Sequence, residues 1–399
     1  MQYIDINNIK INKLRDNYEG YSYDVYNNNY NVLNVSSESL HYNQDILKEI
    51  KEDIFSSKKY NSIFELSSRS SEFLNYIDNI NKNIKYFLKI PNKFKIIWIQ
   101  GGENDHYSSI PLNMSNIFDN VTGYYIVNGK LSRNAYNESK KFINSKILTE
   151  DEFVSKIDKI REDADYLYIC SNEMFNGTEL NINKIKVEFL RELDKKLIIV
   201  DMCIDLFMKE INWNLVDIVT SSTRNIGING CNIMIIRENL LNKLNNKNKI
   251  PYLLDWKNYI DQEYYNKPSH FYFYLVDKII KNYIDDMKNI LQMDNINQAK
   301  AQYLYEYLKY SKNFKSYVND SKKRSNINIL FIVKDGNIKT RNKLLDYCFR
   351  HNIVGLRIKD DDLCDNKLIL LQISLYNYIT IDDVLYIVKV MKNFDKLYK

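Results

Sequence analysis

Three short segments hold the residues of this 399-residue chain whose types and spacing could do chemistry. The first is the turn Gly101-Gly102-Glu103-Asn104-Asp105-His106, which follows an apolar run. Glycine turns at helix N-termini bind phosphate through main-chain N–H groups, but the two carboxylates here would repel it. The others are Asp201, which ends an apolar run, and Arg224 further along. Because a buried aspartate without a partner is costly, the sequence predicts an Asp201–Arg224 ion pair.

The elements that position these segments are short apolar runs, rich in Ile, Val or Tyr, with helical patterns between several of them. This alternation predicts an α/β fold with a mainly parallel sheet that helices cover on both faces. The predicted strands are Lys95–Ile99, Tyr124–Asn128, Leu167–Cys170, Leu197–Asp201, Ile218–Ser221 and Ile233–Arg237. Apolar residues at i, i+3 and i+4 predict helices over Ala135–Ile147 and Ile182–Leu193.

A second lobe is predicted after a long helical pattern, Phe271–Leu291. Its strands are Ile327–Val333 and Leu368–Leu375, and it closes on a helix over Ile381–Phe394. We therefore predict an N-terminal extension over 1–25, a large domain over 26–290 and a small C-terminal domain over 291–399. The first residues of the large domain are expected to pack on the small lobe.

Composition and charge exclude several classes of protein. The net charge of +5 comes from 56 basic and 51 acidic residues, which is nearly balanced and predicts no nucleic-acid partner. No run of about 18 apolar residues exists, so we expect no membrane span. Met1–Asp24 has no apolar or Arg-rich targeting pattern, which favours a cytoplasmic protein. Only 10 residues are glycine, although loops that cradle phosphates depend on glycine.

Cysteine and histidine usage predicts neither disulfides nor a metal centre. The five cysteines form no CxxC pair and lie mostly in or beside apolar runs, so we interpret them as reduced core residues. The four histidines do not cluster in sequence, and no zinc site is expected.

Seven runs, in order, carry a family resemblance. They are Glu65–Phe73; Ile99–Gly102 with Ser108–Asn113; Ile169–Glu173 with Gly177; Arg224–Gly227 with Gly230 and Ile235–Leu241; Leu253–Lys257; Tyr265–Pro268; and Ser374–Asn377. They resemble motifs such as E-x-S-H-R-S-x-E-F and Q-K-N-I-G of the phosphoserine aminotransferases, fold-type I enzymes that use pyridoxal phosphate (PLP). The resemblance implies a mainly parallel seven-stranded sheet flanked by helices, plus a smaller C-terminal α/β lobe.

The resemblance also places the residue that such an enzyme needs most. A lysine amine must form a Schiff base with the cofactor aldehyde. In this chain Arg224 stands at that position, and residues 218–230 contain no lysine. A guanidinium, with a pKa above about 12, cannot act as this nucleophile. We therefore expect no intact catalytic residue and no covalent PLP, although non-covalent PLP stays open.

Most other cofactor positions differ from the family pattern. Asp201 is kept where a carboxylate binds the pyridine nitrogen, and Asn266 is kept where the neighbouring subunit contacts the phosphate. The remaining positions implied for the cofactor are Gly101 and Gly102 in the phosphate turn, Leu131 for the stacking Trp, Met174 for a Thr, Thr223 for a Gln and Lys267 for a Thr. The Asp201–Arg224 pair would fill the space of the absent cofactor.

The substrate positions have lost cationic groups. Arg69 is kept, but Ser68 replaces its neighbouring His. The C-terminal G-H-R and G-x-R patterns fall on Asp365, Asn366 and Gln372, which are acidic or neutral. The A-G-P turn near the N-terminus falls on Val35-Ser36-Ser37.

These residues favour a pseudoenzyme with a structural or protein-binding role. The resemblance implies a homodimer or a heterodimer with a related chain, and other protein partners are open. One alternative is an active phosphoserine aminotransferase, which acts on 3-phosphohydroxypyruvate and glutamate. Another is a small-anion binding module, in which Lys130 or Lys267 supplies positive charge rather than lying on a solvated surface.

Overall fold

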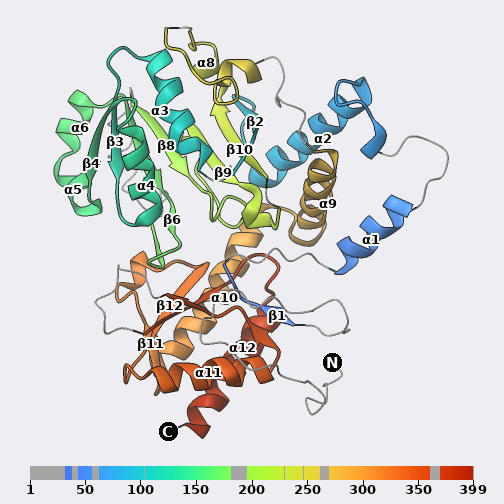
Figure 1. Cartoon of the computed structure of the whole chain (residues 1–399), viewed down its shortest axis with the longest axis vertical. Coiled ribbons are helices and arrows are strands. Elements are labelled where there is room, and N and C mark those ends of the chain that lie inside the picture. The colour runs from blue at the N-terminus through green and yellow to red at the C-terminus, as the bar shows by residue number, and fades with distance from the viewer. Residues whose placement is uncertain are drawn as a thin grey trace.

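A seven-stranded sheet forms the centre of the larger lobe (Figure 1). The computed structural model describes residues 32–37, 44–55, 63–102, 104–180, 196–228, 230–245, 247–260, 269–359 and 369–398. In spatial order the strands are β2 (Phe94–Gln100), β10 (Cys231–Arg237), β9 (Ile218–Ser222), β8 (Leu197–Asp201), β5 (Tyr166–Cys170), β3 (Thr122–Ile126) and β4 (Asn144–Leu148). β10 runs opposite to the other six strands, which are parallel to one another. The predicted α/β fold with a mainly parallel sheet is confirmed.

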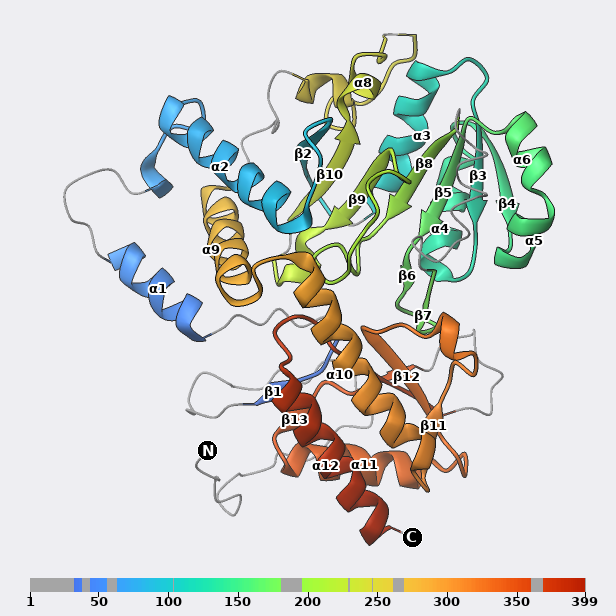
Figure 2. The ribbon, with the colours of Figure 1, turned by 180° about the vertical axis from the view of Figure 1, so that it is seen from behind.

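Helices cover both faces of this sheet because its strands are apolar on both sides. In β8, Ile198 and Val200 join one buried cluster and Ile199 joins the other, as alternation along a strand requires. Figures 1 and 2 show α2 (Ser71–Leu88) and α9 (His270–Met287) beyond one face, and α3 (Asp105–Ile117) and α4 (Lys130–Ser139) beyond the other.

The remaining elements of this lobe are short. The helices are α1 (Gln44–Phe55), α5 (Glu150–Ser155), α6 (Ile157–Asp163) and α8 (Glu238–Leu241), with 3₁₀ turns at η3 (Ile63–Glu65), η4 (Thr223–Ile226) and η5 (Trp256–Tyr259). A small hairpin pairs β6 (Asn172–Glu173) with β7 (Thr178–Glu179).

The smaller lobe is built on a four-stranded antiparallel sheet. Its order is β11 (Phe314–Ser316), β12 (Asn328–Val333), β15 (Leu370–Ser374) and β14 (Arg357–Lys359), and its helices are α10 (Ile290–Tyr310), α11 (Ile338–Arg350) and α12 (Ile381–Leu397), with the 3₁₀ turn η6 (Ser321–Lys323). Near the N-terminus, β1 (Leu33–Asn34) pairs in parallel with β13 (Ile353–Val354) of this lobe. The predicted strands and closing helix are present, whereas the domain boundaries stay predictions.

Two sequence predictions are wrong in their extent. The helix expected over Ala135–Ile147 ends at Ser139, and the edge strand β4 follows it. The sequence did not predict this strand because its half-exposed residues Asn-Ser-Lys-Ile carry no apolar strand signal. The helix expected over Phe271–Leu291 is broken at Lys288, whose φ is 59°. Asn289 then caps α10 by accepting from the N–H of Leu291.

Two further predictions cannot be compared with the fold. The expected helix Ile182–Leu193 and the N-terminal extension lie outside the described residues. Among the residues that the structure does describe, no helix has the length and apolarity needed to cross a bilayer.

A buried lysine ties α10 to the turn after β15. Lys300 is 1% exposed, and its Nζ donates to the carbonyl oxygens of Leu375, Tyr376 and Ile379 at 3.2, 3.1 and 2.9 Å. An ammonium group has three donors, so these carbonyls satisfy it completely. The turn belongs to the Ser374–Asn377 run, and Asn377 in turn donates to the carbonyl of Phe207 in the larger lobe.

Replacing this lysine should destabilise the protein strongly. In Lys300→Met the three buried carbonyls lose their donor, which should cost about 2–4 kcal/mol of unfolding free energy. Urea denaturation followed by circular dichroism measures this. Lys309→Met, on the exposed face of the same helix, is the control and should change stability little. Equal effects of the two substitutions would contradict the role of Lys300.

Candidate functional site

A buried aspartate lies at the carboxyl end of the central sheet, where ligands bind in open parallel α/β folds. Asp201 ends β8 and is 1% exposed. Its Oδ2 accepts from His106 Nε2 at 3.0 Å and from the Tyr168 hydroxyl at 2.8 Å. Its Oδ1 accepts from the main-chain N–H of Cys203 at 2.9 Å. His106, Tyr168, Asp201 and Cys203 are called the strand-end cluster below.

The charge of this aspartate is balanced by a histidine rather than by an arginine. Burial by itself raises the pKa of Asp201, but the charge and hydrogen bond of His106, with the hydrogen bonds from Cys203, bring it below its ordinary value. Burial and the charge of Asp201 raise the pKa of Tyr168 well above its usual range, so its hydroxyl stays protonated and donates. The predicted Asp201–Arg224 ion pair is therefore wrong.

Arg224 instead reaches toward the segment near the N-terminus. It lies in η4, directly after β9, and is half-buried. Its Nη2 donates to the carbonyl of Ser37 at 2.9 Å, and its main-chain N–H donates to Ser222 Oγ. Ser37 belongs to the segment whose strand β1 pairs with β13. Arg224 therefore connects the end of β9 to the segment that pairs with the smaller lobe.

Thr223 closes the loop beside Arg224. It is fully buried, and its hydroxyl contacts the carbonyl oxygens of Ile228 and Cys231 at 2.8 and 3.0 Å. A hydroxyl has one proton, so the two carbonyls share it. The predicted cofactor position at Thr223 is thus occupied by loop-stabilising contacts.

A carboxylate lies over the predicted phosphate turn. Gly101 has φ +146°, and a Cβ added there would lie 1.6 Å from Asp105 Oδ2. Asp105 begins α3, where a negative charge complements the helix dipole. The side chain therefore places its own anion against the glycine turn. The carbonyl of Gly102 accepts from the Asp105 main-chain N–H and from Asn232 Nδ2, while Glu103 lies outside the described residues.

The positions expected to contact the cofactor ring are packed against a second carboxylate. Glu173 accepts from the main-chain N–H groups of Leu131 and Ser132 at 3.0 and 2.7 Å and so caps the start of α4. A Cβ on Gly129 would lie 2.3 Å from the Glu173 carboxyl carbon, which explains the glycine. Leu131 and Met174 are 7% and 3% exposed, and both belong to the same apolar cluster.

The predicted substrate positions do not come together in the described structure. Ser68 and Arg69 lie before α2, where Arg69 is exposed. Gln372 is fully buried on β15, where its amide donates to Asn328 and Ser374. Lys130 lies with its Nζ 4.7 Å from the ring centroid of Phe175. Asn266, Lys267, Asp365 and Asn366 lie outside the described residues.

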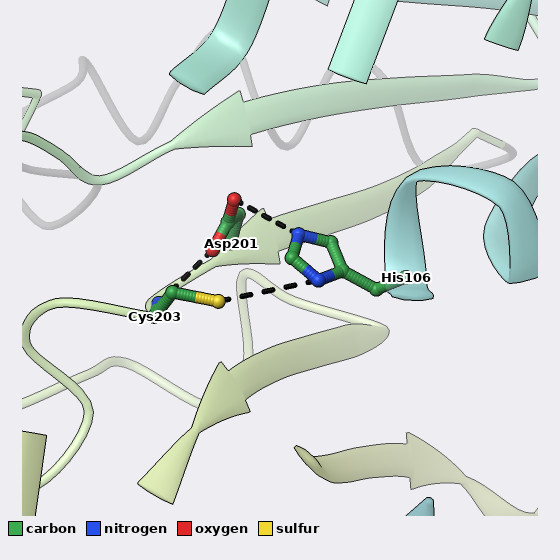
Figure 3. Close-up of side chains that lie close together, drawn as sticks. All are labelled: His106, Asp201 and Cys203. Carbon is green, nitrogen blue, oxygen red and sulfur yellow. Dashed lines mark hydrogen bonds and ion pairs between the residues drawn. The ribbon is translucent and has the colours of Figure 1, made fainter. Parts of the chain in front are cut away.

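The strand-end cluster holds residues that the sequence analysis missed (Figure 3). His106 Nδ1 lies 4.0 Å from Cys203 Sγ, while its Nε2 faces Asp201. Cys203 was expected only as a core residue, and the four described cysteines, Cys170, Cys203, Cys231 and Cys348, are buried and form no disulfide with one another. A search for the partner that buried Asp201 requires could have found His106, since it lies in the first turn of a helix directly after the glycine turn.

Two kinds of bound group can be compared with these residues. One atom each of His106, Asp201 and Cys203 lies within 4.8 Å of the others, and all three residue types bind divalent metals. A single ion binds one ring nitrogen, however, whereas His106 turns its two nitrogens to two different partners. For PLP, Asp201 fits the pyridine nitrogen, but Arg224 does not fit imine formation and Asp105 does not fit a phosphate.

Comparisons with known proteins identify what the chain resembles. The family model described as aminotransferase class-V matches residues 39–387. A probable phosphoserine aminotransferase of Dictyostelium discoideum is 28% identical over 318 residues, which cover 77% of this chain and 81% of that protein. A phosphoserine aminotransferase of Buchnera aphidicola is 27% identical over 327 residues, covering 78% and 83%.

Solved structures show the same fold. The phosphoserine aminotransferase from Bacillus circulans subsp. alkalophilus superposes with a TM-score of 0.79 at 21% identity, covering 92% of this chain and 99% of that chain. A PLP-bound phosphoserine aminotransferase from Trichomonas vaginalis gives a TM-score of 0.76 at 22% identity, covering 91% and 100%. The fold is thus that of PLP-dependent fold-type I aminotransferases.

A second buried carboxylate, Asp205, follows Asp201 in the same turn. The Ser171 hydroxyl donates to its Oδ1, whereas its Oδ2 has no hydrogen-bond partner among the described residues. Burial raises the pKa of Asp205 to about 6, against the opposing charge of Lys209. Lys209 Nζ lies 3.4 Å from Glu179 Oε1.

Removing the charge of Asp205 should change how stability depends on pH. The pKa of Asp205 in the folded state, about 6, lies above the unfolded value of about 3.9. Between pH 4 and 6 the folded state therefore binds more protons than the unfolded state, so the wild type loses stability as the pH rises through this range. Asp205→Asn has no such loss. Its stability relative to the wild type should rise by about 2–3 kcal/mol between pH 4 and pH 7.5, as measured by urea denaturation. Asp119→Asn, at an exposed side chain, is the control, and a pH-independent difference for Asp205→Asn would contradict the assignment.

Proposed function

Because the chain belongs to the class-V aminotransferase family, we propose that it is a phosphoserine aminotransferase-like pseudoenzyme, without covalent PLP and without transaminase activity. The observation that carries the proposal is Arg224 at the position of the Schiff-base lysine. Its guanidinium donates to the Ser37 carbonyl and has no nucleophilic amine to offer. A working aminotransferase needs that amine both to bind the cofactor and to move the proton.

Electrostatics at the phosphate turn support the same proposal. Two unit charges about 4 Å apart at an effective dielectric constant of about 20 interact by about 4 kcal/mol. The Asp105 carboxylate lies against Gly101, so a phosphate bound there would meet repulsion of this order. Burial raises the pKa of Asp105, but the nearby His106 opposes this. The same repulsion argues against the anion-binding alternative at this turn.

An active phosphoserine aminotransferase is the other function that the family implies. It is supported by the retained Asp201 and by the similarity to proteins with that activity. It would require another lysine to replace Arg224. Lys209, the buried lysine that follows Asp201 in sequence, lies beside Glu179 and Asp205 in an acidic cluster.

We further propose that the chain acts through its surface as a dimer or assembly subunit. The two lobes keep the fold of the related enzymes over nearly their whole length, while the contacts of the site residues have become internal. What such a fold still offers is a surface for another chain, either a second copy or a related one. A cytoplasmic location and other protein partners belong to this proposal.

Sedimentation equilibrium tests the dimer. The expected mass is twice the 47.7 kDa of one chain, or the sum of this chain and a related one when both are present. A single-chain mass under both conditions, at micromolar protein, would leave the assembly role without support.

The absence of covalent cofactor is tested by absorbance and by borohydride reduction. Purified full-length protein, incubated with PLP and then gel-filtered, should retain no visible imine band and no stoichiometric reduced adduct on one lysine, because Arg224 cannot form an imine and exposed lysines bind PLP only weakly. It should also form no phosphoserine from 3-phosphohydroxypyruvate and glutamate. A stoichiometric adduct on a single lysine, or turnover above that of the heat-denatured protein, would overturn the proposal.

A pair of variants separates the two obstacles that we propose to covalent PLP binding, the missing amine and the charge of Asp105. Arg224→Lys supplies the amine but leaves the Asp105 charge, whereas Arg224→Lys combined with Asp105→Asn removes both obstacles. The double variant should trap PLP at least about tenfold better than the single one, since a factor of ten corresponds to about 1.4 kcal/mol of repulsion. Asp105→Asn alone should trap none.

A further inference from the structure

The strand-end cluster contains a thiol, an imidazole and a carboxylate in series. Cys203 Sγ lies 4.0 Å from His106 Nδ1, and His106 Nε2 lies 3.0 Å from Asp201 Oδ2 (Figure 3). We propose that Cys203 is a reactive thiol, activated by His106 and Asp201, and that it is a modification site for small uncharged electrophiles such as disulfides. This reactivity requires no PLP and does not depend on the function proposed above.

The two hydrogen bonds of the histidine assign its role. Asp201 carries no proton to donate, so Nε2 is the protonated nitrogen and donates to the carboxylate. In the neutral imidazole the lone pair of Nδ1 then faces the sulfur of Cys203 and can accept the thiol proton. The resulting imidazolium is stabilised by the adjacent carboxylate. This is the order of groups by which a base activates a cysteine and a third group orients the base.

The carboxylate is held firmly in this orientation. Its Oδ1 accepts from the Cys203 main-chain N–H, and its Oδ2 also accepts from the Tyr168 hydroxyl. Cys203 therefore supplies both the main-chain N–H that holds Asp201 and the thiol that faces His106. Because Asp201 reaches the thiol only through His106, it is a positioning residue.

Cys203 is the most exposed residue of the cluster. Cys203 is 6% exposed, whereas His106 is 2% and Asp201 is 1% exposed. Each of the other described cysteines, Cys170, Cys231 and Cys348, is 2% exposed. Burial raises the pKa of all three, and none of them has an imidazole as a described partner. Cys203 is thus distinguished among the described thiols both by its partner and by its access.

The surroundings favour an uncharged reactant. Acidic or neutral ionisable side chains face the cluster from each neighbouring element, namely Tyr107 on α3, Tyr168 and Cys170 on β5, Glu173 on β6 and Asp205 in the turn after β8. Carboxylates near a thiolate repel an anionic electrophile, so a neutral one should react faster. Cys203 is only 6% exposed, which restricts the reactant to small molecules.

The proposed step is a thiol–disulfide exchange. The Cys203 thiol gives its proton to His106 Nδ1, and the thiolate attacks one sulfur of a small disulfide. A new sulfur–sulfur bond forms as the old one breaks, and the leaving thiolate keeps the electron pair. The imidazolium then returns the proton to that leaving group. A second small thiol reverses the modification by the same steps.

Alkylation of the full-length protein tests the proposal. The probes are iodoacetamide, which is neutral, and iodoacetate, which is anionic, and peptide mass spectrometry follows each cysteine separately. At pH 6 Cys203 should react at least about tenfold faster than in His106→Gln, because a paired thiol ionises well below the pKa of about 8.5 of a free one. Iodoacetamide should be preferred over iodoacetate more strongly than for a free thiol, and Asp201→Asn should move the pH profile upward.

Controls keep the outcome decisive. Circular dichroism shows whether each variant is folded, Cys203→Ser shows that the signal belongs to this thiol, and wild-type protein alone gives the pH profile if a variant does not fold. A Cys203 rate that follows an ordinary thiol profile, or no reaction of Cys203 in the folded protein, would overturn the proposal. So would stoichiometric zinc whose removal by a chelator is needed before alkylation, since the cluster would then bind a metal.

Discussion

The need to keep a charged carboxylate inside the protein, at the carboxyl end of the central sheet, governs the arrangement around it. Moving an ionised carboxyl from water into such an environment is costly unless hydrogen bonds and an opposite charge compensate. Three elements supply that compensation for Asp201: α3 provides His106, β5 provides Tyr168, and the turn after β8 provides the N–H of Cys203. The closeness of α3 to the ends of β5 and β8 is therefore tied to this one charge.

The partners that compensate Asp201 in the described structure all come from the chain itself. A pyridine nitrogen is one possible partner for such a carboxylate, and an imidazole nitrogen is another. In this structure the imidazole of His106 is that partner. Asp105, which lies against Gly101, is a second group from the chain itself at this end of the sheet. Its carboxylate complements the dipole at the N-terminus of α3, where a phosphate could otherwise bind.

Arg224 and Lys300 show how side-chain donors stabilise contacts between segments far apart in the sequence. Each donates to main-chain carbonyls: Arg224 to Ser37, and Lys300 to three carbonyls after β15. Such contacts satisfy buried main-chain acceptors that helices and strands leave unpaired. Figure 2 shows α10, which carries Lys300 into the smaller lobe.

The sequence by itself determined the class of fold, because apolar runs and helical periodicity depend on local spacing, and six central strands followed from them. It also determined that Arg224 cannot be an imine-forming residue, since that is a property of the side chain alone. It did not reveal β4, whose half-exposed residues lack an apolar signal, nor the break at Lys288. Only the tertiary structure decided which side chain meets Asp201. His106 and Asp201 are 95 residues apart in the sequence. The length of an arginine side chain shows how far it can reach but not in which direction it points. The partner is set by how α3 packs on the strand ends, which no local pattern encodes.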